Sequence, residues 1–295
     1  MGWGGLARAL GLATLRFTGV VMIAITFAFF VERLLPGPPP DPRPVLDHYA
    51  EYWANLLEPT VAARVGSALP WSIAIIGTAA LISFAVGTIL GAWMARPGRG
   101  LAGRLLSLPV MILATVPAFL IGMVLVAILA QGLRLLPPAL AFWPTQTWQN
   151  PLAVAIDLLS HAILPILTIS LAGIGVFALA MRGATVMTLN ADHVLYAHAL
   201  GLSERRVFWA HEVRLALIPL VTALGISLSA IVASALLVEA TLSYPGVGWM
   251  LWLAVIGGDL PMVRGVMVVL IVTLAMTTTL VDLLLPRLDP RLQRR

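Results

Sequence analysis

Long apolar runs constrain this chain more than any other feature. They occupy residues 14–34, 69–95, 105–133, 161–181, 219–239 and 262–285. Each reaches the roughly 20 residues that an α-helix needs to cross a bilayer. Charged residues make up only 11% of the 295 positions, against about 25% in soluble domains. Hydrocarbon offers no hydrogen-bond partner to backbone N–H and C=O groups, and an α-helix satisfies these groups internally. We therefore predict an all-α membrane protein with about six transmembrane helices, in one domain over residues 1–295.

The distribution of arginine predicts the orientation. With the N-terminus in the cytoplasm, 13 of the 18 Arg fall on the cytoplasmic side and 5 on the other. The positive-inside rule then places both termini and the loop 182–218 in the cytoplasm, and the loops 35–68, 134–160 and 240–261 outside. The net charge of +5 follows from the same bias and needs no nucleic acid. No small-x-small cleavage site follows the first run, so we expect an uncleaved helix in a bacterial inner membrane rather than a signal peptide.

Missing residue types exclude several chemistries. The chain has no Cys, which removes disulfides, thiolate metal sites and cysteine nucleophiles. It has no Lys, so a P-loop is absent and any ATP must be bound by another chain. His211-Glu212 begins like a zinc-protease motif, but Leu215 stands where the second His is required. Asp157 and His161 suit a helix cap better than a metal site. We expect no catalytic site, no metal and no cofactor on this chain.

Two local features leave their interpretation open. Pro109 and Pro117 predict kinks in the third run, tolerated where neighbouring helices satisfy the freed carbonyls. Residues 47–64 carry aromatic side chains at helical spacing. They suit either a helix lying in the membrane interface or a helix packed against the bundle.

One polar stretch, residues 182–219, interrupts the apolar pattern. It gathers four Arg, two Glu, one Asp and three of the five His within 38 residues. Asn190 or Asp192 can cap a short helix at 191–200, and Gly201 can take the left-handed conformation that ends it. Ser203 can cap a second helix, which presents Val207, Ala210 and Leu217 on one side and is closed by Pro219, unless that proline instead starts the fifth run. The stretch thus predicts a helix–glycine–helix knob outside the membrane, or an ordinary amphipathic loop.

Two carboxylates fall within apolar runs. Glu239 ends the fifth run, and Asp282 lies inside the sixth. Intramembrane acids are candidates for function because they are costly to keep in hydrocarbon. They could contact a substrate, or they could cap helices and bond between them.

Several segments resemble one transporter family. The sequence A-H-A-L-G-L-S-E-R-R-V at 197–207, with His211, Arg214 and Pro219 following, resembles the EAA loop of ABC-importer permeases. E-A-T-L-S-Y-P-G-V-G at 239–248 and D-L-P-M-V-R-G at 259–265 resemble further motifs of the oligopeptide, dipeptide and nickel branch, in its B-type permease. L-L-P-G at 34–37 and L-D-P-R at 288–291 extend the resemblance across the chain. The chain departs from the pattern at His198, Leu200, Glu212 and Pro38.

The resemblance implies a type I ABC-importer permease that forms half of a translocation pathway for di- or oligopeptides. It implies a second homologous permease, two cytoplasmic ATPase subunits that hold ATP and Mg, and an extracytoplasmic substrate-binding protein. The coupling residues would be Ala197, His198, Gly201, Leu202, Ser203, Glu204, Arg205 and Arg206. The pathway or its extracytoplasmic mouth would involve Glu239, Tyr244, Pro245, Gly246, Asp259 and Asp282.

Other functions stay open at this level. The same architecture could import nickel, a metal chelate or a glutathione-like compound. A secondary transporter using Glu239 and Asp282 as ion carriers would show two repeats with interrupted helices, and no convincing repeat is present. A membrane-embedded hydrolase has no motif here, since Gly225-Ile226-Ser227-Leu228-Ser229 lacks the last Gly of a nucleophile elbow.

Overall fold

The computed structural model describes residues 3–34, 44–56, 58–96, 100–138, 150–189 and 191–288, and all regular structure in these ranges is helical. The elements are α1 (Trp3–Leu34), α2 (Val45–Ala54), α3 (Pro59–Ala95), α4 (Gly100–Thr115), α5 (Ala118–Leu125), the π-helix η1 (Val126–Gly132), α6 (Pro151–Thr188), α7 (Asp192–Ala199), α8 (Glu204–Val207), the π-helix η2 (Phe208–Glu212), α9 (Val213–Thr241), α10 (Val247–Gly257) and α11 (Leu260–Leu288). Asn190, the Pro-Gly that follows α1 and the Asp-Pro-Arg that follows α11 lie outside the described residues.

Four of these helices, α1, α3, α6 and α11, contain stretches long and apolar enough to cross a membrane, judged over the described ranges. Three of them, α1, α3 and α6, begin about ten residues before the expected runs. A proline occupies the first turn of α3 and of α6, where its missing N–H costs nothing. Asn150 also caps α6 by accepting the Leu152 N–H at 3.1 Å. At 37 and 38 residues these helices are about 55 Å long, so they extend beyond a hydrocarbon core of about 30 Å.

The third expected run, 105–133, is not one kinked helix. It is broken between α4 and α5, which meet at a bend of 106°. Pro117 is the N-cap residue of α5 and cannot donate a hydrogen bond back to α4. The helix restarts in a new direction, and the pair makes a fifth crossing only if both halves count as one.

The centre of the bundle is the pair α3 and α6, which approach closely through small residues. A Cβ on Gly91 would lie 2.3 Å from the carbonyl oxygen of Ala178, and one on Gly87 would lie 2.7 Å from Cβ of Phe177. The Ser83 hydroxyl donates to the carbonyl of Ala79 at 2.6 Å and also approaches that of Ser170 across the interface, at 3.2 Å. Small residues and a bridging hydroxyl are the usual means of helix association in membranes.

Helix α2 packs against the bundle. Tyr52 is buried between Phe29 of α1 and Val268 of α11, and the Arg264 guanidinium lies 4.7 Å from its ring centroid. Tyr49 donates to or accepts from Thr26 at 2.8 Å. Of the two interpretations of residues 47–64, the structure therefore shows the packed helix for the part that forms α2.

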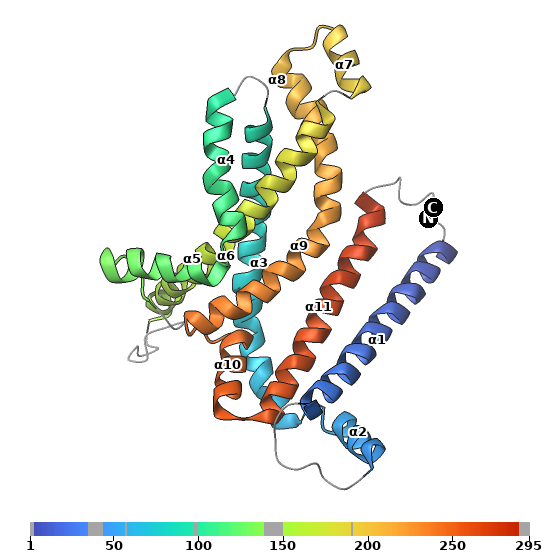
Figure 1. The fold of residues 1–295 in the computed structure, drawn as a ribbon, viewed down its shortest axis with the longest axis vertical. Helices are drawn as coiled ribbons and strands as arrows, with labels where there is room; N and C mark the ends of the chain where they lie inside the picture. The colour runs from blue at the N-terminus through green and yellow to red at the C-terminus, as the bar shows by residue number, and fades with distance from the viewer. Residues whose placement is uncertain are drawn as a thin grey trace.

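Figure 1 shows that two pairs of short helices lie at opposite ends of the bundle. Helices α7 and α8 lie at the end where α1 begins and α11 finishes, whereas α2 and α10 lie at the other end. Helix α9 runs between them, from η2 to the loop before α10. Its 29 residues correspond to about 44 Å. It occupies the position of the fifth expected span, and it continues through Pro219 rather than starting or ending there.

Candidate functional site

The knob, residues 191–207, consists of α7, a glycine turn and α8. Gly201 has φ +73, the left-handed conformation that the sequence predicts for it. Its N–H donates to the carbonyl of His198 at 2.9 Å, and the Leu202 N–H donates to that of Ala197 at 3.3 Å. These two bonds form a Schellman motif, which satisfies carbonyls that the end of a helix leaves free.

A small apolar cluster holds the knob together. Val194, Ala197 and Val207 are buried, and Ala191 and Leu202 pack against them. Ala197 is only 3% exposed, so it faces the interior of the knob rather than a partner. Of the predicted coupling residues, Leu202 is half-buried, and His198, Gly201, Ser203, Glu204, Arg205 and Arg206 are exposed.

Three local predictions for the knob were wrong. The N-cap position of α7 is Ala191, whose side chain cannot accept a hydrogen bond, and Asp192 is the first helical residue. Ser203 occupies the N-cap position of α8 but makes no side-chain capping bond. Ala210 is exposed, and Phe208 and Glu212 are buried instead. The π-helical turn of η2 shifts the buried face, because each wide turn takes up an extra residue.

Glu212 lies where the knob joins α9. Its side chain is 4% exposed, and among the described residues its Oε2 has no hydrogen-bond partner. Burial raises the pKa of this carboxyl above its ordinary value, and the nearby His198 and His193 lower it in part. The Thr188 hydroxyl approaches the backbone carbonyl of Glu212 at 3.3 Å, which ties the end of α6 to this turn.

At the other end of α9, Glu239 is completely buried. Its Oε2 accepts the Gly248 N–H at 2.6 Å, in the first turn of α10. The Ser72 hydroxyl of α3 hydrogen-bonds to the same carboxylate and accepts the Val247 N–H at 2.8 Å. Glu239 thus fills the N-terminus of a helix, where the dipole favours a negative charge. Of the two interpretations of this acid, the structure shows the capping one.

The segment between α9 and α10 folds back sharply. Ser243 has φ +51, and the Tyr244 N–H donates to the carbonyl of Glu239 at 2.9 Å. The ring of Tyr244 is buried and meets Trp71 of α3 edge-on at 6.1 Å between centroids. Burial, and to a lesser extent Glu239, raises the pKa of Tyr244 to about 12, so its phenol stays neutral.

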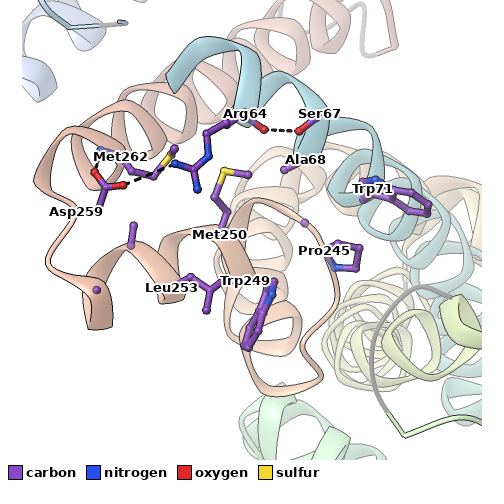
Figure 2. A pocket seen from close by; sticks show the side chains of 13 residues that line it. Arg64, Ser67, Ala68, Trp71, Pro245, Trp249, Met250, Leu253, Asp259 and Met262 are labelled. Atoms are coloured by element: carbon purple, nitrogen blue, oxygen red, sulfur yellow. Dashed lines mark hydrogen bonds and ion pairs between the residues drawn. The ribbon is translucent and has the colours of Figure 1, made fainter. Parts of the chain in front are cut away.

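A cavity of about 550 Å³ opens beside this segment (Figure 2). Pro245, Gly246 and Asp259 line it, as do Arg64, Trp71, Trp249, Met250 and Met262. Arg64 Nη1 and Asp259 Oδ2 are 3.8 Å apart. Asp259 Oδ1 also accepts the Met262 N–H at 3.1 Å and so caps α11. Three residues predicted for the pathway, Pro245, Gly246 and Asp259, therefore line one cavity. Arg64 and Trp71 of α3 line it as well, and no sequence motif indicated them.

Asp282 does not belong to this site. It lies in the last turns of α11, 22 residues beyond Leu260, which corresponds to about 33 Å along the helix. α11 begins beside α10 and runs away from it (Figure 1). Asp282 is therefore far from Glu239, and the two acids do not share one site.

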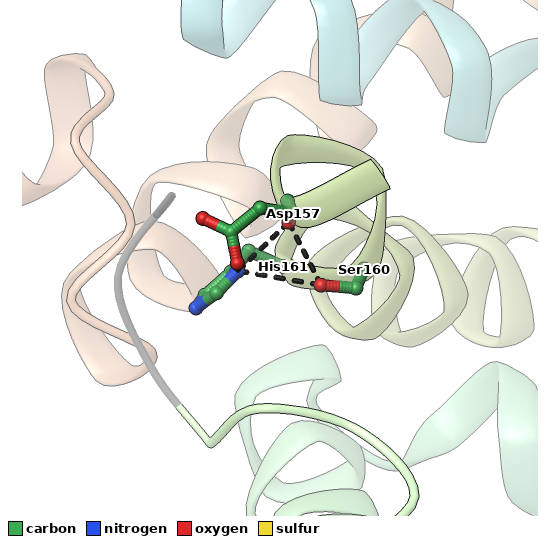
Figure 3. Close-up of polar contacts among 3 residues, drawn as sticks. All are labelled: Asp157, Ser160 and His161. Atoms are coloured by element: carbon green, nitrogen blue, oxygen red, sulfur yellow. Dashed lines mark hydrogen bonds and ion pairs between the residues drawn. The ribbon is translucent and has the colours of Figure 1, made fainter. Parts of the chain in front are cut away.

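Asp157 and His161 form a second buried polar group, on α6 (Figure 3). His161 Nδ1 lies 2.8 Å from the carbonyl of Asp157 and 3.5 Å from its Oδ1, and Ser160 donates to the same carbonyl at 2.8 Å. Both side chains are buried in the helix rather than at its first turn. Over the described part of the chain, no three His, Asp or Glu side chains gather as a metal site would require.

Membrane-length helices, a polar knob at one end and a capped helix beside a cavity at the other define a multi-pass membrane transport component. The chain belongs to the family of binding-protein-dependent transport system inner membrane components, whose family model matches residues 87–294. It is 27% identical to the dipeptide transport system permease protein DppB of Lactococcus lactis over 92% of this chain and 95% of the relative. It is 26% identical to the di/tripeptide transport system permease protein DppB of Pseudomonas aeruginosa, over 98% of each. The Escherichia coli K12 DppB is 31% identical over 48% of this chain and 41% of its own length.

Proposed function

We propose that the chain forms half of the membrane pathway of an ATP-driven importer of di- and oligopeptides. The observation that carries this is the Gly201-terminated knob, projecting from one end of the bundle in a chain of this family. The relatives named for dipeptide and tripeptide transport cover nearly the whole chain and support a peptide substrate.

The knob is the surface on which an ATPase subunit would dock. The polar residues His198 and Ser203 to Arg206 are exposed around a buried Ala197, so the partner would meet polar side chains held on a small apolar core. The knob end is then cytoplasmic, in keeping with the arginine distribution. A second permease, two ATP-binding subunits and an extracytoplasmic binding protein complete the assembly. ATP and Mg are held by the ATPase subunits, and this chain carries no catalytic site.

The cavity beside α10, called the outer cavity from here on, has a lining whose chemistry suits a peptide. Trp71, Trp249 and Met250 offer apolar surface, and Arg64 and Asp259 offer one charge of each sign at its wall. A short peptide carries a carboxylate, an ammonium group and side chains of mixed polarity. Helix α10, which lines this cavity, lies at the end opposite the knob (Figure 1), where the substrate would enter.

The test is uptake in proteoliposomes. The chain is purified from its native membrane under mild detergent, and co-purifying proteins are identified by mass spectrometry. Recovery of a second permease and P-loop ATPases, followed by ATP-dependent uptake of a labelled dipeptide, is the expected result. Uptake of Ni²⁺ or a Ni²⁺ chelate, with no uptake of the dipeptide, would refute the assignment of a peptide substrate. Uptake by the chain alone, driven by an ion gradient, would refute the importer assignment.

A further inference from the structure

Three helices meet at one buried carboxylate. The Glu239 junction consists of Glu239 of α9, Ser72 of α3, and Val247 and Gly248 of α10. Glu239 and Val247 are 0% and 2% exposed, so water does not compete for these bonds. The carboxylate holds the Gly248 N–H and the serine hydroxyl holds the Val247 N–H, at 2.6 and 2.8 Å. Within this low-dielectric site, hydrogen bonds are electrostatically stronger than in water.

The backbone around the Glu239 junction is so closely packed that two of its glycines have no space for a side chain. A Cβ on Gly246 would lie 2.3 Å from Glu239 Oε2 and 2.5 Å from Ser72 Oγ. A Cβ on Gly248 would lie 2.3 Å from the carbonyl oxygen of Leu236 on α9. Gly257, at the far end of the same helix, has nothing within 4 Å. The close fit is therefore confined to the end of α10 that faces Glu239.

Helix α9 connects this junction to the knob. It starts directly after η2, which follows α8, so the chain from Glu204 to Thr241 is helical throughout. Glu239 stands in the last turn of α9 and caps the first turn of α10. A displacement of the knob along or about α9 would reach α10 through this carboxylate. Helix α10 contributes Trp249, Met250 and Leu253 to the wall of the outer cavity.

We propose that Glu239 is a positioning residue that locks α10 to the outer ends of α9 and α3, so that movement of the knob is passed to the wall of the outer cavity. Glu239 does so without contacting substrate, because its side chain is fully buried. This inference rests on the proposed function, since it assigns a transport role to the junction.

The absence of Cys gives the junction a direct probe. In a Val247→Cys chain the introduced thiol is the only one, and the 2% exposure of Val247 predicts that a maleimide reagent reacts slowly. The Glu239→Ala change leaves the buried Gly248 N–H without its acceptor. The fraction of molecules in which α10 has separated from the junction should therefore rise by about ten-fold or more. Labelling of the thiol at position 247 should rise by that factor. This readout needs neither ATP nor a substrate.

A conservative change and a matched control complete the set. Glu239→Gln keeps an oxygen that can accept the Gly248 N–H, so labelling should stay within about two- to three-fold of the parent. Gly257→Ala adds a methyl group to the open end of α10 and should change neither labelling nor uptake. Ser72→Ala removes one bond of the junction and should raise labelling by less than Glu239→Ala.

In the assembled importer, Glu239→Ala should lower dipeptide uptake about ten-fold while ATP hydrolysis continues, and Glu239→Gln should restore uptake. A loss of assembly would lower hydrolysis and uptake together. Unchanged labelling and uptake in Glu239→Ala would overturn the proposal, as would a Gln variant as defective as Ala. If Glu239→Ala is not recovered in the membrane, unchanged labelling in Ser72→Ala overturns it. Absence of ATP-driven uptake in the unaltered chain would reject the proposed function instead, whatever the labelling shows.

Discussion

Replacing Gly201 by Ala tests how the knob is held in shape. Gly201 has φ +73, and a Cβ placed on it would meet nothing within 4 Å. The cost of the change is therefore conformational and not steric, about 1–2 kcal/mol for an L-residue in the left-handed region. If the substituted knob relaxes out of this turn when free and the ATPase subunit binds only the folded form, binding must restore the turn, which should weaken it by a factor of about 5–30.

Gly183→Ala is the matched control, because Gly183 also has open space around it but lies within helix α6. There Ala should be neutral or stabilising by up to about 1 kcal/mol. Gly201→Pro should be more severe than Gly201→Ala, since proline fixes φ near −65° and removes the N–H that bonds to His198.

The assay is binding of the purified ATPase subunit to the permease in nanodiscs, followed by biolayer interferometry, with uptake measured in parallel. All three variants should remain in the membrane. Gly201→Ala should lose affinity and uptake, and Gly183→Ala should keep both. Equal affinity for the parent and Gly201→Ala would refute the reasoning, because it would show that the left-handed turn does not shape the docking surface.

Three further changes follow from the geometry. Ser243→Gly should raise the stability of the detergent-solubilised chain by about 1 kcal/mol, seen as a higher Tm, because Ser243 has φ +51 and glycine relieves that strain; an unchanged Tm would contradict this. Gly91→Ala should lower stability by about 1–3 kcal/mol in the same assay, since its Cβ would overlap Ala178, and a neutral result would show that α3 and α6 can separate without cost. Glu212→Gln should flatten the pH dependence of Tm. The folded chain holds the Glu212 proton more tightly than the unfolded chain, so stability falls as pH rises from about 4.5 to the raised pKa, and an equal slope in the Gln variant would contradict the burial effect.

Local pattern was sufficient for the parts of this protein that local physics controls. Apolar runs of membrane length and the helix–glycine–helix pattern predicted the helical bundle and the knob. Gly201 is the clearest instance, because the left-handed turn depends only on the residues beside it. The same reasoning failed at Ala191 and Ala210, where the actual cap and the π-turn depend on what the knob packs against.

The site at the end opposite the knob could be found only from the tertiary structure. Glu239 was visible as an acid in an apolar run, but its partner Ser72 gave no signal, since the serine meets α10 across 175 residues of sequence. Arg64 and Trp71 were likewise outside every motif. The sequence alone determined that the chain crosses a membrane and carries a polar knob, because hydropathy and turn chemistry are local. Only the tertiary structure decided that Glu239 caps α10 beside Ser72, because the partner of a buried carboxylate depends on how the helices pack, and the sequence does not show that packing.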